Sequence, residues 1–374
     1  MSMDRQIVIH QPARLEIGAG TAQQVGEWAA GAKRILVLTV PVLEPLVAKL
    51  ALPGMVHVIT DVPPEPDDIA LDRTLAAAAE LKPDVIIGLG GGSVMDIAKL
   101  VSVLWDGEQA LSDVIGLDKV NRSLSRLALI PTTAGTGSEA GIRALVTNAQ
   151  TKAKMAVESK HMRAELAVLD PELSYTVPPA VTAATGVDAM AHCVEAFTNI
   201  RAHDMVDGFA RMGIKLVGQH LARAVENGQD TEARAGMMLA SYYGGICLGP
   251  VNTAAGHALA YPLGTRLNLP HGLANAIIFP HVLAFNQTVQ PGKTAEVLDA
   301  LGLAAGDNSP EHVFAVAHEY CAGLGVEMRL SKHGAQQEDL QSWAEEAHAI
   351  RRLMDNNPRD MTVSDVLAIY KAAY

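Results

Sequence analysis

The chain has 374 residues, of which 49% are hydrophobic and 19% are charged. This composition is typical of a well-filled globular interior and excludes a disordered chain, and the length favours two domains over one. The formal net charge of −12 argues against nucleic acid or an anionic membrane surface as the main partner. It does not exclude an anionic small substrate, because a local pocket can oppose the field of the whole protein.

Cysteine usage and the N-terminus indicate the cellular compartment. The three cysteines, Cys193, Cys247 and Cys321, are odd in number and widely spaced, so they imply no disulfide framework. A reducing cytoplasm is the simplest fit. The first residues lack the basic start and apolar run of a signal peptide, and no stretch approaches the roughly 20 apolar residues that span a bilayer. We therefore expect a cytoplasmic protein that does not insert into membranes.

The first 170 residues predict strands that alternate with helices. Strands are expected at 7–9, 15–18, 33–39, 56–59, 84–89, 127–130 and 166–170, and helices at 71–81 and 94–105. Short runs that are apolar throughout are typical of parallel strands buried on both faces. Alternation with helices predicts βαβ units and a doubly wound, Rossmann-like parallel sheet.

A strand–glycine–helix junction at Gly90-Gly91-Gly92-Ser93 is the first candidate for ligand binding. At such a junction, backbone N–H groups and the positive end of the helix can face a phosphate. The loop departs from the usual dinucleotide fingerprint, because a serine replaces the last glycine and the loop lies outside the first βα unit. A bare Gly-Gly-Gly-Ser is more often a turn, but its place after a clean strand favours anion binding.

A second polar loop, at 131–138, follows the strand expected at 127–130. Its hydroxyl groups and glycines would lie at the carboxyl end of a strand, where ligands bind in open α/β sheets. The alternative interpretation is a turn rich in serine and threonine.

The second half of the chain predicts helices only. Pro178 and Pro179 mark the expected boundary, because proline suits the first turn of a helix. From Ala180 onward no clear strand appears, and alanine, leucine and methionine dominate in blocks of helical length. We expect an α/β domain at 1–178 and an all-helical domain at 179–374.

Four residues of the second half have the chemistry of metal ligands. Asp188 and His192 are four residues apart, which places them one turn apart on the same face of a helix. With His257 and His271 they make one carboxylate and three imidazoles, an N/O set for a divalent transition metal. Each histidine alone would more often be a packed core residue. Cys193 would point about 100° away from His192, so we interpret it as a packing residue.

Four segments together resemble the iron-containing (group III) alcohol dehydrogenase family, in its order and at its spacing. They are Gly-Gly-Gly-Ser-Val-Met-Asp at 90–96, Pro-Thr-Thr-Ala-Gly-Thr-Gly-Ser-Glu at 131–139, Gly-Val-Asp-Ala-Met-Ala-His-Cys-Val-Glu at 186–195, and 257–271. The resemblance covers nearly the whole chain. It implies a Rossmann-like nicotinamide dinucleotide-binding domain and an all-helical catalytic domain, the two-domain plan shared with dehydroquinate synthase.

The resemblance also assigns site residues. It implies metal ligands at Asp188, His192, His257 and His271, and it favours Fe²⁺, whereas the ligand set also admits Zn²⁺. The cofactor contacts that it implies are Gly90, Gly91, Gly92, Ser93, Asp96, Thr132, Thr133, Thr136 and Lys154. The implied reaction is hydride transfer between NAD or NADP and a small alcohol or carbonyl compound, in a homo-oligomer.

Three positions bear on catalysis and specificity. Many family members have a second histidine four residues after the one matching His257; here it is Tyr261, which could donate a proton or only shape the pocket. Val40 stands where NAD-specific members often have an aspartate that repels the 2′-phosphate, so one barrier to NADP is removed. Arg143 matches a position near the substrate. It could bind an anionic group of the substrate, or pair with a carboxylate such as Glu139 four residues away.

Other functions remain open at this point. They are a hydroxyacid–oxoacid transhydrogenase, a maleylacetate reductase-like enzyme, a metal- and NAD-dependent lyase of the dehydroquinate synthase type, and a non-catalytic protein with a structural metal. Net NADH formation with an alcohol would separate a dehydrogenase from a lyase, and a transhydrogenase would need no added nucleotide. A structural metal site would be closed to further ligands.

Overall fold

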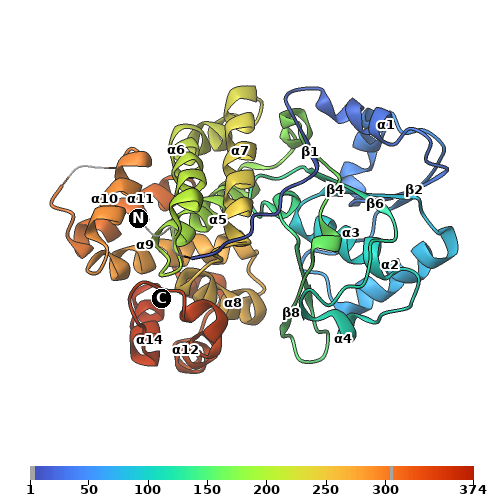
Figure 1. The fold of residues 1–374 in the computed structure, drawn as a ribbon. Coiled ribbons are helices and arrows are strands. Elements are labelled where there is room, and N and C mark those ends of the chain that lie inside the picture. Colours follow the sequence, from blue (N-terminus) through green and yellow to red (C-terminus); the bar gives the residue numbers. More distant parts are fainter. Residues whose placement is uncertain (1–4, 304–305) are drawn as a thin grey trace. The chain divides into compact units, whose positions relative to one another are not determined.

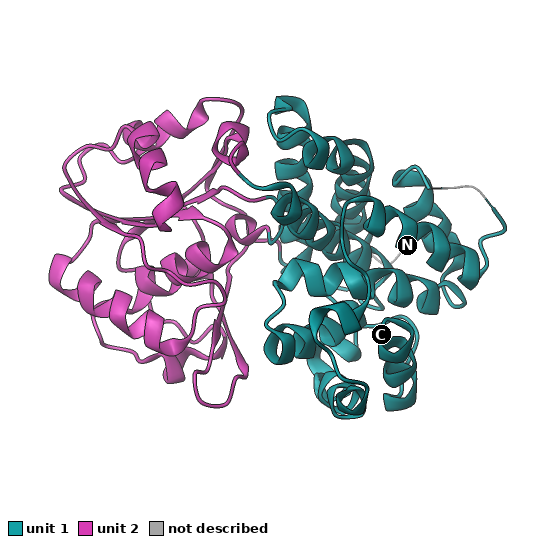
Figure 2. Cartoon of the chain, turned by 180° about the vertical axis from the view of Figure 1, so that it is seen from behind, with its two compact units in different colours: residues 1–8, 134–136, 177–374 teal, residues 9–133, 137–176 magenta. Residues whose placement is uncertain are grey.

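The computed structural model describes residues 5–303 and 306–374, which form two compact units (Figure 1, Figure 2). Unit 1 contains the described residues up to 8, then 134–136 and 177–374, and is helical. Unit 2 contains residues 9–133 and 137–176 and carries the strands. The chain passes from unit 2 to unit 1 for the last time at 176–177, beside Pro178 and Pro179.

Unit 2 is built on a six-stranded parallel sheet in the order β1-β9-β6-β4-β2-β3. Its strands are β1 (Arg14–Ile17), β2 (Arg34–Leu38), β3 (Met55–Ile59), β4 (Val85–Gly90), β6 (Arg126–Pro131) and β9 (Leu166–Leu169). Its helices are α1 (Gln24–Trp28), α2 (Asp68–Leu81), α3 (Gly92–Leu104) and α4 (Leu111–Val114). The predicted Rossmann-like fold is thus confirmed.

Apolar side chains of the central strands are buried on both faces of this sheet. On β2, Ile35 and Val37 pack in a cluster that includes residues of α1, whereas Leu36 and Leu38 pack with residues of α2 and α3. Successive side chains of a strand point to opposite faces, so a strand covered on both sides needs a continuous apolar run. This explains why the sequence signal for these strands is strong.

The strand order places a ligand crevice at the carboxyl ends of β2 and β4. The strand that follows β2 in sequence, β3, lies on one side of it, and the next strand, β4, lies on the other. In open α/β sheets, ligands bind where the strand order reverses in this way. The loop that begins at Gly90 and the residues after β2, Thr39 and Val40, therefore flank the expected crevice.

Two features of the N-terminal half of the chain depart from the sequence prediction. The sequence pattern does not predict a second sheet, but β5 (Gly116–Leu117), β8 (Lys154–Glu158) and β7 (Arg143–Thr147) form one in that order, with β7 antiparallel to β8. The strand predicted at 7–9 is wrong. Ile7 packs against the helical core of unit 1 and Val8 is 58% exposed, with no neighbouring strand to bond the backbone.

Unit 1 consists of helices, and the structure shows no strand among its described residues. The helices are α5 (Pro179–Thr198), α6 (Asp204–Glu226), α7 (Thr231–Leu248), α8 (Ala255–Leu267), α9 (His271–Gln287), α10 (Pro291–Ala300), α11 (Pro310–Gly323), α12 (Leu340–Ala349), α13 (Arg351–Met354) and α14 (Val363–Ala372). One core cluster joins α5, α6, α7 and α9 to α10 and α11, and a second joins α8 and α9 to α12, α13 and α14. Because α9 contributes to both clusters, it fixes the positions of α5 and α8 relative to each other.

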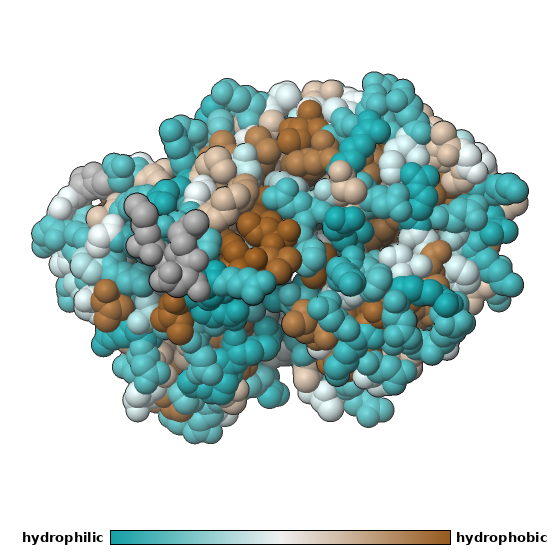
Figure 3. Space-filling model, viewed as in Figure 1, coloured by the Kyte–Doolittle hydropathy of each residue, from teal (hydrophilic) through white to brown (hydrophobic). Residues whose placement is uncertain are grey.

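The surface is mainly polar. On the face shown in Figure 3, hydrophilic side chains dominate and apolar side chains form separate patches. The large exposed apolar residues are spread along the chain, from Val42 and Ile69 to Met212 and Val289. Among the described helices, none combines the length and the apolar character that crossing a membrane requires.

Candidate functional site

Three helices of unit 1 bring the four predicted metal ligands together. Asp188 and His192 lie one turn apart on α5, His257 lies in the first turn of α8, and His271 is the first residue of α9. One potential ligand atom from each residue lies within 4.8 Å of the corresponding atoms of the other three. Pro270 directly precedes α9 as its N-cap and has non-helical backbone angles, φ −52° and ψ 136°, so the helix begins at His271.

The imidazoles surround one carboxylate oxygen. Asp188 Oδ1 lies 3.8 Å from His192 Nε2 and 3.6 Å from Nε2 of both His257 and His271. These separations are long for hydrogen bonds. They suit atoms that bind a common ion, because two ligand atoms about 2.1 Å from a tetrahedral metal lie roughly 3.4 Å apart.

The residues fit a divalent metal. His257 Nε2 is buried without a hydrogen-bond partner in the described part of the chain. A buried polar atom without a partner costs free energy, and few occur in folded proteins. A cation bound between this nitrogen and Asp188 Oδ1 would give the nitrogen a partner. Cys193 is buried in the apolar core and belongs to no such group, and burial raises the pKa of its thiol to about 12, as expected of a packing residue.

Electrostatics favour the metal-binding forms of two ligands. Burial acts to raise the pKa of Asp188, but the three imidazoles hold that pKa well below its usual range. Burial lowers the pKa of His192 to about 4, so this imidazole is neutral at neutral pH. Burial acts to lower the pKa of His257, but Glu195 and Asp188 raise it to about 10. A metal must therefore displace a proton from His257.

Two further residues hold the ligands in place. Glu195 Oε1 lies 2.7 Å from His257 Nδ1, so an ionised Glu195 accepts the proton of Nδ1 and leaves Nε2 to face Asp188. Asn275 Nδ2 donates to Asp188 Oδ1 at 2.8 Å and lies 3.2 Å from His271 Nε2. Neither residue was predicted from the sequence as part of the site. The available signal was helical spacing, because Glu195 follows His192 by three residues and Asn275 follows His271 by four.

Tyr261 lies beside the ligand group. It follows His257 by one turn of α8, and its ring centroid is 5.8 Å from that of His271. The side chain of Arg352, on α13, lies over the Tyr261 ring, and its Nη2 is 3.4 Å from the hydroxyl oxygen. Arg352 belongs to no sequence motif and was not predicted as a site residue.

In unit 2 the two polar loops lie side by side. The N–H of Thr132 donates to the carbonyl of Gly90 at 3.0 Å, and a Cβ at Gly91 would stand only 3.2 Å from Thr133 Oγ1. Gly92 opens α3, whose N-terminal N–H groups and partial positive charge suit an anion. The structure therefore brings these predicted cofactor contacts together. Thr136 belongs to the short segment 134–136 that is part of unit 1.

The charged residues predicted near the cofactor are engaged by the protein. Asp96 accepts hydrogen bonds from Ser138 Oγ at 2.6 Å and from the N–H of Leu145 at 2.9 Å, which ties α3 to β7. Lys154 forms an ion pair with Glu65. The N–H of Glu65 donates to Ser93 Oγ at 3.2 Å. These side chains connect the loops to one another.

Arg143 also has a protein partner, although not the expected one. Its Nε and Nη2 lie 3.0 and 2.9 Å from Glu158 Oε2, and the two residues face each other across β7 and β8. The expected alternative was an ion-paired arginine, and the structure shows one, with Glu158 as the partner in place of the suggested Glu139. Arg143 lies in a strand, so the helical spacing that suggested Glu139 does not apply. Glu139 is instead 1% exposed, and burial raises its pKa to about 7.

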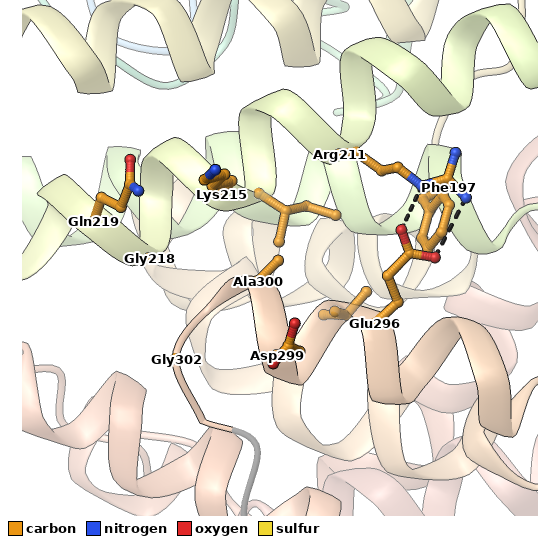
Figure 4. Close-up of a pocket in the computed structure, with 11 residues that line it drawn as sticks. Phe197, Arg211, Lys215, Gly218, Gln219, Glu296, Asp299, Ala300 and Gly302 are labelled. Carbon is orange, nitrogen blue, oxygen red and sulfur yellow. Dashed lines mark hydrogen bonds and ion pairs between the residues drawn. The ribbon is translucent and has the colours of Figure 1, made fainter.

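A separate pocket of about 490 Å³ lies between α6 and α10 (Figure 4). Arg211 and Glu296 form an ion pair across it, and Phe197 lies behind that pair. None of the four ligand residues lines this pocket. Its wall lacks the converging histidine and carboxylate groups that distinguish the first site, so we do not assign it to the chemistry.

Comparison with known proteins matches both halves of the chain. The family model described as iron-containing alcohol dehydrogenase matches residues 12–171, and that for the Fe-containing alcohol dehydrogenase family, C-terminal, matches residues 182–374. The chain is 36% identical over 362 residues to long-chain-alcohol dehydrogenase 1 of Geobacillus thermodenitrificans, covering 92% of this chain and 90% of that protein.

Solved structures share the fold. The structure of a 1,3-propanediol oxidoreductase is similar with a TM-score of 0.93 and 29% identity, covering 99% of this chain and 100% of that one. A sulfoacetaldehyde reductase from Bifidobacterium kashiwanohense, solved in complex with NAD⁺, is similar with a TM-score of 0.88 and 25% identity, covering 99% of both chains.

Proposed function

The chain belongs to the iron-containing alcohol dehydrogenase family of oxidoreductases, and from this premise we propose that it transfers a hydride between a nicotinamide dinucleotide and a small alcohol or carbonyl compound. The observation that carries the proposal is the group of Asp188, His192, His257 and His271, whose potential ligand atoms lie within 4.8 Å of one another. We assign the metal to these four residues, with Fe²⁺ as the native ion and Zn²⁺ as the alternative.

The reaction balances with one hydride and one proton. In the direction of reduction, a bound reduced nicotinamide would supply the hydride that the carbonyl carbon accepts, and the carbonyl oxygen would take up one proton. A bound divalent metal would supply Lewis-acid polarisation of the carbonyl. The protein's own contribution is positional, because Glu195 and Asn275 orient the ligands and the burial of three of them excludes water.

We assign Tyr261 as the proton donor. Its ring lies beside His271, and its hydroxyl carries an exchangeable proton at this side of the ligand group. Tyr261→Phe removes only the hydroxyl, so kcat should fall on the order of 10²-fold while metal content is unchanged. An unchanged kcat would reduce the role of Tyr261 to shaping the pocket.

We assign dinucleotide binding to the domain at 1–178 and catalysis to the domain at 179–374. Support comes from the glycine loop at the carboxyl end of β4 and from its contact with Thr132 and Thr133. The remaining assigned contacts are Gly92, Ser93, Asp96, Thr136 and Lys154. NAD and NADP are both included, since Val40 carries no charge that would repel a 2′-phosphate.

The substrate class that we propose includes carbonyl compounds with an anionic group. One similar structure is named a sulfoacetaldehyde reductase, and that protein's named substrate carries a sulfonate. We further propose a cytoplasmic homo-oligomer. Support for a reducing compartment comes from Cys193, Cys247 and Cys321, which are all free and buried.

A nucleotide assay under anaerobic conditions tests the proposed function. Protein loaded with Fe²⁺ or with Zn²⁺ should oxidise NADH or NADPH when aldehydes, ketones or oxoacids are added, and form it with alcohols. Removal of the metal by a chelator should abolish both reactions, and returning the metal should restore them. Absence of net nucleotide turnover by the metal-loaded protein with every substrate would contradict the proposal and favour a lyase or a transhydrogenase.

A further inference from the structure

The ligand group is exposed on one side only. The side chains of Asp188, His192 and His257 are 3 to 5% exposed, whereas that of His271 is 28% exposed. Within unit 1, a small molecule therefore reaches the group most easily past His271. Tyr261 lies on this side, with its ring against the His271 ring.

Arg352 is the next side chain beyond Tyr261. Its guanidinium carbon lies 5.5 Å from the centre of the Tyr261 ring, and the two side chains contact again at the hydroxyl. The backbone beneath it is fixed, because Asn356 Nδ2 donates to the carbonyls of Arg352 at 3.1 Å and Thr253 at 2.8 Å. The planar guanidinium is thus held over an aromatic face at the exposed side of the ligand group.

Arg352 forms no ion pair within the described part of the chain. Nearby arginines differ, since Arg351 pairs with Asp355 and Arg266 pairs with Glu346. The chain as a whole has 41 acidic and 29 basic residues, so carboxylates outnumber the cations with which they can pair. An exposed arginine without a carboxylate partner is therefore notable in this chain. A guanidinium with five donors and no carboxylate partner, placed at the open side of a metal-ligand group, is suited to bind an anion.

We propose that Arg352 is a specificity-determining residue that binds the carboxylate or sulfonate of a short carbonyl substrate. The inference rests on the proposed function, because it assumes that the carbonyl oxygen lies at the Asp188–His192–His257–His271 group. Tyr261 positions the guanidinium through its ring. Arg143 is less suited to this role, because Glu158 already neutralises it.

Two substrates of equal chain length test the proposal. Kinetics with 4-oxobutanoate and butanal should be compared in the wild type, in Arg352→Ala and in Arg352→Lys. Arg352→Ala should lower kcat/KM for the anion about tenfold, and a larger loss is not expected because solvent screens an exposed guanidinium. The loss for butanal should be clearly smaller, and it reports only the contact of Arg352 with the Tyr261 hydroxyl. Arg352→Lys should retain part of the preference, because it keeps the charge but loses the planar fork.

The matched control is Arg351→Ala, which removes a neighbouring arginine that pairs with Asp355. It should leave the preference for the anion unchanged. Equal losses for both substrates in Arg352→Ala, or no loss for either, would overturn the proposal. Loss of the preference in the Arg351 variant as well would also overturn it, since the effect would then be that of surface charge in general.

A binding measurement separates this proposal from the proposed function. Calorimetry with butanoate and butanamide on the metal-loaded protein needs no turnover. Butanoate should bind more tightly, and Arg352→Ala should weaken it about tenfold without changing metal content. If hydride transfer failed with all substrates but butanoate still depended on Arg352, the function would be wrong and the anion site would stand. If the wild type and Arg352→Ala bound butanoate with equal affinity, the proposed anion site at Arg352 would be wrong.

Discussion

The metal-ligand group of unit 1 and the charged residues around the loops of unit 2 differ in whether the protein already satisfies them. In unit 1, His257 Nε2 is buried without a partner and faces Asp188. In unit 2, Asp96 is bonded to Ser138 and Leu145, and Lys154 is paired with Glu65. Within the described part of the chain, a buried histidine nitrogen that has no partner and faces a carboxylate indicates an absent ligand, whereas satisfied side chains indicate scaffold. Cofactor binding should therefore depend more on backbone N–H groups of the glycine loop than on Asp96 or Lys154.

The largest effect should come from removing a ligand of unit 1. His271→Ala deletes one of the four proposed ligand side chains and should abolish both bound metal and turnover. Elemental analysis measures bound metal, and NADH oxidation measures turnover. His333→Ala is the control, because that histidine contacts the Glu327 carbonyl instead of the ligand group and should retain full metal. Full metal occupancy in His271→Ala would remove the assignment.

A smaller loss should follow when the orienting group changes and the ligands stay. Glu195→Gln preserves the shape but removes the charge that fixes the Nδ1 proton of His257. Loss of such a partner typically weakens metal binding about 10- to 100-fold. Competition with a metal chelator measures the affinity. If the affinity were unchanged, the Glu195 contact would be irrelevant to the metal.

Unit 2 should respond to pH through Glu139. Burial raises the pKa of this carboxyl from 4.5 to about 7, so the folded protein binds its proton more tightly than the unfolded chain does. The associated stability is complete below pH 4.5 and is lost as pH rises towards 7. Glu139→Gln should therefore gain about 3 kcal/mol relative to the wild type between pH 4.5 and pH 8. Urea unfolding of both proteins at the two pH values measures their free energies of unfolding. If the difference between the two proteins did not change with pH, the prediction would be contradicted.

Cofactor choice offers a test at the carboxyl end of β2. Val40 lies directly after Thr39 there, so Val40→Asp should place a negative charge near the 2′-phosphate of NADP. The KM for NADPH should rise about tenfold and that for NADH less than twofold, because like charges at close range repel. Steady-state kinetics with both nucleotides measure the two KM values in the wild type and in Val40→Asp. Equal changes would show that Val40 does not face the ribose.

The smallest effect is expected at Arg143, where the structure shows a paired side chain. Arg143→Ala breaks a partly exposed ion pair with Glu158, and such pairs contribute about 0 to 1 kcal/mol. We expect kcat/KM to change less than about threefold for 4-oxobutanoate and butanal alike. A strong, selective loss for 4-oxobutanoate would instead support the prediction that Arg143 binds the substrate anion.

The sequence predicts what depends on local pattern and fails where distant segments pair. Apolar runs such as the one at 84–89 identify strands, because a strand buried on both faces needs them. Helical spacing on α5 correctly groups Asp188 with His192. The β7–β8 pair has no such signal, since each strand has only five residues and begins and ends with a charged or polar residue. The position of Arg352 beside Tyr261 depends on how α13 packs against α8, which no local pattern encodes.

The central claim is that a metal held by Asp188, His192, His257 and His271 enables hydride transfer to a carbonyl carbon. The most direct test is transfer of an isotope label from NADH that carries deuterium at the transferable position of the nicotinamide. With butanal and Fe²⁺-loaded protein, mass spectrometry should find one deuterium on the carbinol carbon of butanol, and none after the metal is removed. Label in the product without metal, or reduction without label in the presence of metal, would contradict the account.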